Sequence, residues 1–247
     1  MHPKHHRTVD RVTELLEAIA RDGDGLTLSE LATRLEAPKS SIQGLLQGLL
    51  ATGYVVEHDG TFALGPGPYV LTLIANRMPA RLVSHSDLVE LAEMTGETVL
   101  LAVRAGDHAI YIDEVGSHPM LDFVARSRSR RPLLTTAAGK IIMADMADHD
   151  LHRYLADLPA DQQSAVADFF DQIATIRETG LAYNREASIA GVDAVGTAVR
   201  DHRGELVAAL VVAGRKEAVE NRLEQLGQTA QQAAQRWGQR RTGPYPA

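Results

Sequence analysis

The sequence predicts an α+β protein: an N-terminal winged helix-turn-helix, a linker helix, and a C-terminal, mainly antiparallel sheet with flanking helices. Three observations support this. Apolar residues recur at helical spacing before Gly53, Asp59-Gly60 is a hairpin signal, and later apolar segments of strand length alternate with helices. With 247 residues, 45% of them hydrophobic, the chain is long enough to form two separate cores.

Three helices are expected in the N-terminal part. Apolar residues from Val9 to Ile19 recur at helical spacing until "RDGDG" ends the pattern. Thr27 and Glu30 have the spacing of a capping box, which begins a second helix. Pro38 suits the first turn of a third helix that ends near Gly53, because its missing N–H needs no partner there.

A hairpin follows the third helix. "YVVEHDGTFAL" predicts two short strands joined at Asp59-Gly60, a dipeptide typical of two-residue hairpin turns. Three helices followed by a hairpin form a winged helix-turn-helix, whose third helix enters a DNA major groove.

The segment "LGPGPYVLTLIANRMP" predicts a boundary and then a linker helix. Its Gly-Pro-Gly-Pro run interrupts regular structure, and Tyr69 to Met78 is mostly apolar and ends before Pro79. An exposed helix of this composition needs a partner, either the second domain or the same helix of another subunit. The expected domains are residues 1–65, the linker 66–80, and residues 81–247.

The second domain is expected to alternate strands and helices. A helix ending at Gly96 includes Leu82 and Val83. The expected strands are "ETVLLAV", "HAIYIDEV", "MLDFVAR", "LAYNREA", "AVGTAVRD" and "ELVAALVVA". Helices are expected around Thr136–Met146, Asp148–Leu155 and Asp161–Thr179, and a last helix from about Arg215 carries one apolar stripe: Val219, Leu223, Leu226, Ala230, Ala233 and Trp237.

Composition limits the classes of function. The apolar runs are shorter than the roughly 20 residues of a membrane-spanning helix, and the N-terminus lacks a secretory signal, so we expect a cytoplasmic protein with no membrane partner. The absence of cysteine excludes disulfides, thiolate metal sites and thiol catalysis. Residues 1–66 carry six basic and nine acidic side chains, a net charge of −3, so a DNA-binding interpretation depends on geometry rather than on charge.

Five stretches carry a resemblance to a known family: "LTLSELATRLEAPKSSI", "GYVVEHDGTFALGP", "ETVLLAV", "RRPLLTTAAGK" and "RETGLAYNREASIAGVDAVGTAV". In this order and spacing, from about Val9 to Gly214, the sequence resembles the IclR-type transcriptional regulators. The resemblance implies a winged helix that binds operator DNA and a linker helix used in dimerisation. It also implies a GAF- or profilin-like domain that binds a small organic effector, in a dimer or a dimer of dimers.

The candidate DNA contacts begin the third helix: Lys39, Ser40, Ser41, Gln43 and Gly44, with Arg7 at the start of the first helix. Short polar side chains there can reach phosphates, and Gln43 can read an adenine edge. The alternative is an ordinary solvated helix N-terminus. Relatives usually have a basic residue where this chain has Gly44.

Gly44 and Gly48 each cost a helix interior roughly 1 kcal/mol relative to alanine. We therefore expect each to allow a close approach. Gly44 would lie close to DNA, and Gly48 would pack against another backbone such as that of helix one.

The candidate effector contacts are Leu134, Thr135, Thr136, Ala137, Ala138, Gly139, Asn184, Asp193, Ala194, Val211 and Ala213. "LLTTAAGK" places two threonines before a helix whose first N–H groups could face a carboxylate. The alternative is a plain N-cap. A Walker A phosphate loop is excluded because leucine stands where its first glycine would be.

The pocket departs from the family pattern in one direction. Asn184 stands where Asp is frequent, Ala194 where Cys is frequent, and Val211 and Ala213 where serines are common. Fewer polar groups predict a larger or more apolar effector, such as an aromatic acid or a derivative. Asp193 could bind an amine or hydrazine-like group, or face solvent.

Two clusters of charged or titratable residues are expected to be solvent-exposed rather than functional. Arg126, Arg128, Arg130 and Arg131 are expected in a solvated loop, the alternatives being contact with an anionic effector or with another subunit's acidic face. His149 and His152 are expected on an exposed polar helix, so neither a metal site nor a cofactor is predicted.

The leading hypothesis is a ligand-responsive repressor of a catabolic operon, released from operator DNA by a small organic acid. A transcriptional activator is an alternative. A protein-interaction module that has lost DNA binding is another, favoured by the acidic N-terminal domain and Gly44. An enzyme is not expected, because the sequence has no nucleophile elbow, metal-ligand array or acid–base pair at recognisable spacing.

Overall fold

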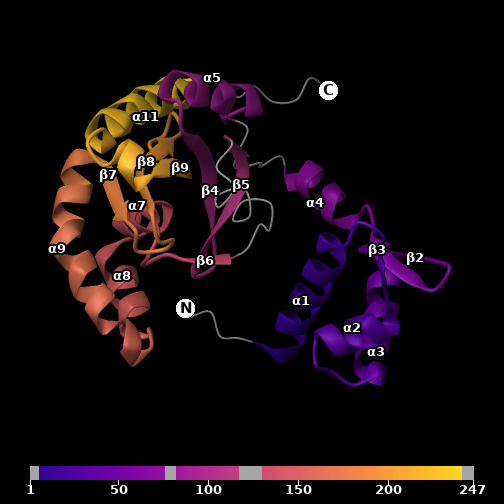
Figure 1. Ribbon diagram of the computed structural model, residues 1–247. Coiled ribbons are helices and arrows are strands. Elements are labelled where there is room, and N and C mark those ends of the chain that lie inside the picture. The colour runs from indigo at the N-terminus through magenta and orange to yellow at the C-terminus, as the bar shows by residue number, and fades with distance from the viewer. Residues whose placement is uncertain (1–5, 76–81, 117–129, 241–247) are drawn as a thin grey trace. The chain divides into compact units, whose positions relative to one another are not determined.

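The computed structural model describes residues 6–75, 82–116 and 130–240 (Figure 1). The chain forms two compact units, Met1–Met78 and Pro79–Ala247. None of the helices in these described ranges is both long and apolar enough to cross a membrane.

The first unit is a winged helix-turn-helix, as predicted. Its elements are α1 (Arg7–Arg21), β1 (Leu26–Thr27), α2 (Leu28–Arg34), α3 (Lys39–Ala51), β2 (Val55–His58), β3 (Thr61–Leu64) and α4 (Gly67–Ala75). The strands form an antiparallel sheet in the order β1-β3-β2. Strand β1 was not predicted. It is only two residues long and pairs Leu26 with Phe62.

Local signals account for the boundaries of these elements. Thr27 and Glu30 form the predicted capping box, in which each side chain bonds the other residue's backbone N–H. Asp59 and Gly60 have φ angles of 49° and 78°, the left-handed pair that a two-residue hairpin turn needs. Both predictions are confirmed.

The linker helix α4 starts in tight contact with the winged domain. Gly65 N–H donates to the Tyr54 carbonyl (2.8 Å) and Gly67 N–H to the Gly53 carbonyl (2.9 Å). A Cβ atom added at Gly65 would lie 2.4 Å from the Gly53 oxygen, so only glycine fits. The predicted helix end at Met78 lies outside the described residues.

The second unit contains one antiparallel sheet in the order β6-β5-β4-β9-β8-β7. Its elements are α5 (His85–Thr95), β4 (Thr98–Ala105), β5 (His108–Val115), β6 (Arg130–Pro132), α7 (Ala137–Asp145), α8 (Asp148–Ala156), η2 (Ala160–Gln162), α9 (Gln163–Thr179), β7 (Leu181–Arg185), β8 (Val192–Arg200), β9 (Leu206–Arg215), α10 (Lys216–Val219) and α11 (Leu223–Gly238). Helices α7, α8 and α9 pack on one face, and α5, α10 and α11 on the other.

Four details differ from the sequence-based expectation. Ser84 caps α5, so Leu82 and Val83 precede the helix as buried residues. The last helix is split into α10 and α11, although its predicted apolar stripe is fully buried. Arg130 and Arg131 belong to the edge strand β6 rather than to a solvated loop, whereas Arg126 and Arg128 lie outside the described residues. A short 3-10 turn, η2, precedes α9. The predicted strand "MLDFVAR" lies outside the described residues.

Candidate functional site

The exposed face of α3 carries most of the predicted DNA contacts. Lys39, Ser40, Gln43 and Gly44 are exposed, and Ser41 is half-buried. The opposite face, with Ile42, Leu46 and Leu49, is buried in the core of the first unit. The helix therefore presents a polar, small-residue face to solvent, as a groove-binding helix requires.

Two cations hold the start of α3. Lys39 Nζ donates to Ser29 Oγ of α2 (2.8 Å), and Arg11 Nη1 of α1 donates to Ser41 Oγ (3.3 Å). From the sequence, Arg11 was a possible contact to the DNA backbone together with Arg7, the alternative being ordinary surface. It lies one helical turn after Arg7, which is exposed in the first turn of α1. Arg11 therefore places a positive charge beside the N-terminus of α3.

The two glycines of α3 are both open to solvent. A Cβ atom added at Gly44 or at Gly48 would meet nothing within 4 Å. The prediction that Gly48 packs against another backbone is therefore wrong within this unit. Gly44 leaves a gap on the exposed face, and its close approach to DNA stays a prediction.

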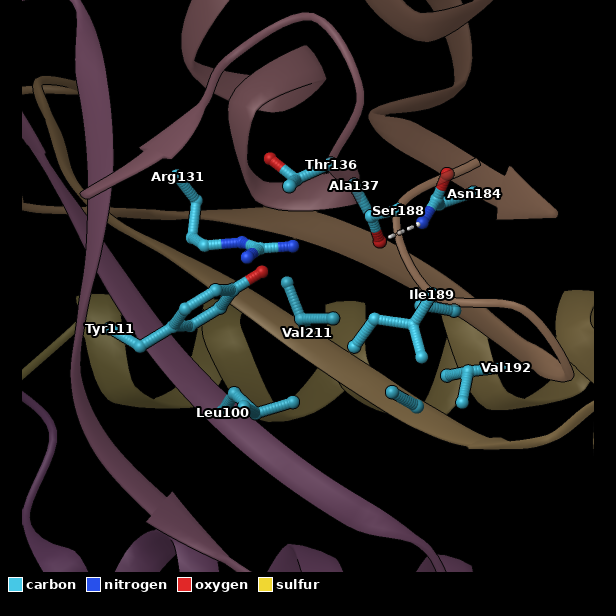
Figure 2. Close-up of a pocket in the computed structure, with 12 residues that line it drawn as sticks. Leu100, Tyr111, Arg131, Thr136, Ala137, Asn184, Ser188, Ile189, Val192 and Val211 are labelled. Atoms are coloured by element: carbon cyan, nitrogen blue, oxygen red, sulfur yellow. Dashed lines mark hydrogen bonds between the residues drawn. The ribbon is translucent and has the colours of Figure 1, made fainter. Parts of the chain in front are cut away.

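The second unit contains a cavity of about 30 Å³ between the start of α7, the sheet, and the connection from β7 to β8 (Figure 2). That volume holds about one water molecule. Twelve residues line it: Leu100, Tyr111, Arg131, Thr136, Ala137, Asn184, Ser188, Ile189, Val192, Ala194, Val211 and Ala213. Six of them were predicted effector contacts: Thr136, Ala137, Asn184, Ala194, Val211 and Ala213.

Strand register brings these residues together. Leu100 of β4 lies opposite Val211 of β9, while Ala213 of β9 lies opposite Ala194 of β8, which in turn lies opposite Asn184 of β7. Residues directly opposite each other in antiparallel strands point to the same face of a sheet. The floor of the cavity is therefore made from four adjacent strands.

The start of α7 is a satisfied N-cap. Thr136 Oγ1 accepts from Gly139 N–H (3.0 Å) and donates to the Pro132 carbonyl (3.1 Å). A Cβ atom added at Gly139 would lie 2.0 Å from the Leu133 oxygen, so this glycine is needed for close packing. The amide of Gly139 is thus already used.

Five of the predicted effector contacts do not line the cavity. They are Leu134, Thr135, Ala138, Gly139 and Asp193. Leu134, Ala138 and Gly139 are buried in packing around α7.

Asp193 lies on the other face of β8 from Val192 and Ala194, because side chains alternate along a strand. Its side chain is 1% exposed, so the alternative in which it faces solvent is wrong. Neither carboxylate oxygen has a hydrogen-bond partner among the described residues, and Arg185 Nη1 lies 3.9 Å away.

Six lining residues were missed as contacts: Leu100, Tyr111, Arg131, Ser188, Ile189 and Val192. Figure 2 shows the Arg131 guanidinium and the Tyr111 hydroxyl turned toward each other at one side of the cavity. Burial raises the pKa of Tyr111 to about 12, opposed by the charge of Arg131, so this hydroxyl stays protonated at neutral pH. The signal for Arg131 was the arginine-rich stretch from Arg126 to Arg131, because contact with an anionic effector was one of the alternatives considered for that stretch.

Polar atoms also lie on the opposite side. Asn184 Nδ2 donates to Ser188 Oγ (2.8 Å), and Asn184 Oδ1 is buried with no partner within the described part of the chain. Among the described residues no group of three or more His, Asp or Glu side chains could hold a metal ion.

A winged helix-turn-helix in one unit and a cavity whose floor is made from four adjacent strands in the other are typical of a ligand-responsive DNA-binding regulator. Comparison with known proteins agrees. Residues 8–59 match the IclR helix-turn-helix domain, and residues 73–237 match the C-terminal domain of the bacterial transcriptional regulator IclR. The chain belongs to the IclR family of transcriptional regulators.

Individual relatives support this assignment. The HTH-type transcriptional regulator Rv1719 of Mycobacterium tuberculosis is 30% identical over 213 residues, which cover 83% of this chain and 81% of the relative. The HTH-type transcriptional repressor AllR of Escherichia coli is 25% identical over 220 residues, which cover 85% of this chain and 81% of the relative. These relatives are transcriptional regulators, not enzymes.

A solved structure shares the fold. The crystal structure of an IclR homolog from Microbacterium hydrocarbonoxydans, complexed with 4-hydroxybenzoate, superposes with a TM-score of 0.74 at 20% identity, covering 93% of this chain and 97% of that one.

Proposed function

We propose that the protein represses a catabolic operon and that a small, largely apolar organic acid releases it from operator DNA. The observation that carries the proposal is the lining of the cavity, in which seven of the twelve residues are aliphatic: Leu100, Ala137, Ile189, Val192, Ala194, Val211 and Ala213. Such a lining favours an apolar ligand body over a small keto acid. A relative named as a repressor and a structural neighbour that holds 4-hydroxybenzoate are consistent with it.

The cavity must enlarge to bind such a ligand. Its volume of about 30 Å³ is far below the roughly 150 Å³ that accommodates benzene. Ser188 and Ile189 belong to the connection between β7 and β8, which has no regular structure. Because connections move at lower cost than strands or helices, this wall is the part expected to shift.

DNA binding would use α3 in a dimer. The net charge of −3 over residues 1–66 gives weak electrostatic attraction for one copy, so two copies on two half-sites are needed for useful affinity. Helix α4 offers the contact: Tyr69 and Ile74 are 65% and 75% exposed, and Val70, Leu71 and Leu73 are exposed beside them. A second α4 would cover this apolar surface.

Effector and DNA would be coupled through two states of the dimer. The acid can release DNA only if it binds the weakly DNA-binding state more tightly. The coupling is reciprocal, so operator DNA must weaken binding of the acid by the same factor.

A gel-shift titration tests the proposal, using DNA from immediately upstream of the protein's own gene and a panel of aromatic and aliphatic acids. We expect specific retardation that weakens as salt rises and is abolished by an aromatic acid. A stronger shift with the acid would favour an activator. No specific shift under any condition would instead favour the interaction module suggested by the acidic first unit. Tighter binding of pyruvate or glyoxylate than of any aromatic acid would contradict the predicted ligand class.

A further inference from the structure

A cationic side chain, Arg131, lines the cavity on the side where β5 and β6 pair. Arg131 of β6 lies opposite Ala109 of β5, so the two side chains share one face of the sheet. Tyr111 lies two residues after Ala109 on the same strand and therefore points to that face as well. Register alone thus makes Arg131 and Tyr111 diagonal neighbours on the cavity side, as Figure 2 shows.

Both side chains carry hydrogen-bond donors. Arg131 Nε is buried and has no hydrogen-bond partner among the described residues. The Tyr111 side chain is 7% exposed, and its hydroxyl is protonated at neutral pH, as described above. A guanidinium has several N–H groups in one plane, an arrangement that matches the two oxygens of a carboxylate.

The competing anion site at the start of α7 is weaker than the sequence suggested. Its Gly139 amide donates to Thr136 Oγ1, and Thr136 in turn donates to the Pro132 carbonyl. The cap therefore already uses the Gly139 amide, whereas on the β5–β6 side Arg131 Nε has no partner among the described residues.

Resting on the proposed function, we infer that Arg131 and Tyr111, rather than the N-terminus of α7, bind the effector's carboxylate. The apolar body of the ligand then lies over Val211 and Leu100. Figure 2 shows Ser188 and Asn184 across the cavity from Arg131. Because Ser188 Oγ accepts from Asn184, its own hydrogen is free to donate to an oxygen at the far end of the ligand. The effector class is a ring-sized monocarboxylate with an oxygen substituent opposite the acid group.

Calorimetry on the full-length protein tests this assignment with 4-hydroxybenzoate, benzoate and benzamide. Wild type should bind benzoate at least about tenfold more tightly than benzamide, because only the acid carries the charge. Arg131→Gln should lose about 10- to 100-fold for benzoate and 4-hydroxybenzoate and change little for benzamide. Ser188→Ala should reduce the preference for 4-hydroxybenzoate over benzoate.

Arg130→Gln is the matched control. Arg130 is exposed and precedes Arg131 on the same strand, so its side chain points to the opposite face of the sheet. The affinities of Arg130→Gln for the three ligands should therefore stay within about twofold of wild type. Arg131→Lys keeps the positive charge but lacks the planar guanidinium, so its affinity for benzoate should lie between those of wild type and Arg131→Gln. Fluorescence of the buried Trp237 verifies that each variant is folded.

The outcomes separate the two proposals. Failure of every acid to bind wild type would reject the acid class of the proposed function. Binding of acids with unchanged affinity in Arg131→Gln, or equal binding of benzoate and benzamide, would overturn the Arg131–Tyr111 assignment alone.

Discussion

An ion pair between the buried carboxylate of Asp87 and the half-exposed side chain of Arg240 should make the stability of the second unit depend on pH. Asp87, in the first turn of α5, is 6% exposed and accepts from Arg240 Nη2 at 2.7 Å, with Arg240 Nη1 bonding its other oxygen. The Arg240 hydrogen bonds, with help from Ser84, lower the pKa of Asp87 from 3.8 to about 2, against the opposing effect of burial. One pKa unit is about 1.4 kcal/mol, so the ionised carboxylate stabilises the fold by about 2 kcal/mol.

The sign follows from the direction of the shift. A carboxyl whose pKa is depressed by folding stabilises the protein above its unfolded pKa, and that stabilisation is lost as the pH falls from about 4 toward 2. We therefore expect Asp87→Asn to lower the free energy of unfolding by about 2 kcal/mol at pH 7. The gap between variant and wild type should narrow steadily below pH 4.

Urea titration followed by tryptophan fluorescence measures this directly. Trp237 is the chain's single tryptophan, fully buried in α11 and three residues before Arg240, so its signal reports on the second unit. Protein concentration is held fixed, since self-association would add apparent stability.

Glu90→Gln provides the control for this experiment. It breaks the Arg236–Glu90 pair (3.0 Å), which joins α11 to the same helix α5, but those side chains are 56% and 53% exposed. An exposed pair contributes less than about 1 kcal/mol. An equal loss in both variants, or a gap for Asp87→Asn that is the same at pH 7 and pH 3, would refute the reasoning.

Three further predictions concern other parts of the chain. Gly139→Ala places a methyl group against the Leu133 backbone and should destabilise the second unit by about 3 kcal/mol in the same fluorescence assay; unchanged stability would contradict the packing. Gly44→Ala and Gly48→Ala should each stabilise the first unit by about 1 kcal/mol in thermal melts, because both sites are open, while only Gly44→Ala should weaken operator binding. Equal DNA affinity for the two would show that Gly44 does not approach DNA closely. Replacing Tyr69 and Ile74 together by serine should shift sedimentation toward monomer, and an unchanged dimer would place the subunit contact elsewhere.

Most of the fold could be predicted because its signals are local. The capping box at Thr27 and Glu30 and the turn at Asp59-Gly60 depend on residues within one turn of chain, and both formed as expected. The strand β5, His108–Val115, matches its predicted segment, since an apolar run between turns needs no distant information. The split between α10 and α11 was missed because the apolar stripe continues unbroken across it.

The site was harder to predict because register decides which side chains meet. Arg131 reaches the cavity only because β6 pairs with β5, and a short edge strand in an arginine-rich stretch has no distinctive pattern. Asp193 was misplaced for a related reason: it lies one residue from Val192 and Ala194, and a single step along a strand moves a side chain to the other face. The prediction for Gly48 was wrong because the sequence does not show which atoms lie next to a glycine in the folded chain, and here none lies within 4 Å of an added Cβ.

The most direct test of the account measures operator affinity and effector response together, in wild type and in Arg131→Gln. Fluorescence anisotropy of labelled DNA from upstream of the protein's own gene is recorded with and without 4-hydroxybenzoate. We predict that both proteins bind DNA with equal affinity without the acid, that the acid releases wild type, and that Arg131→Gln stays bound at the same acid concentration. Acid-induced release that is identical in the two proteins, or acid that leaves wild type bound, would contradict it.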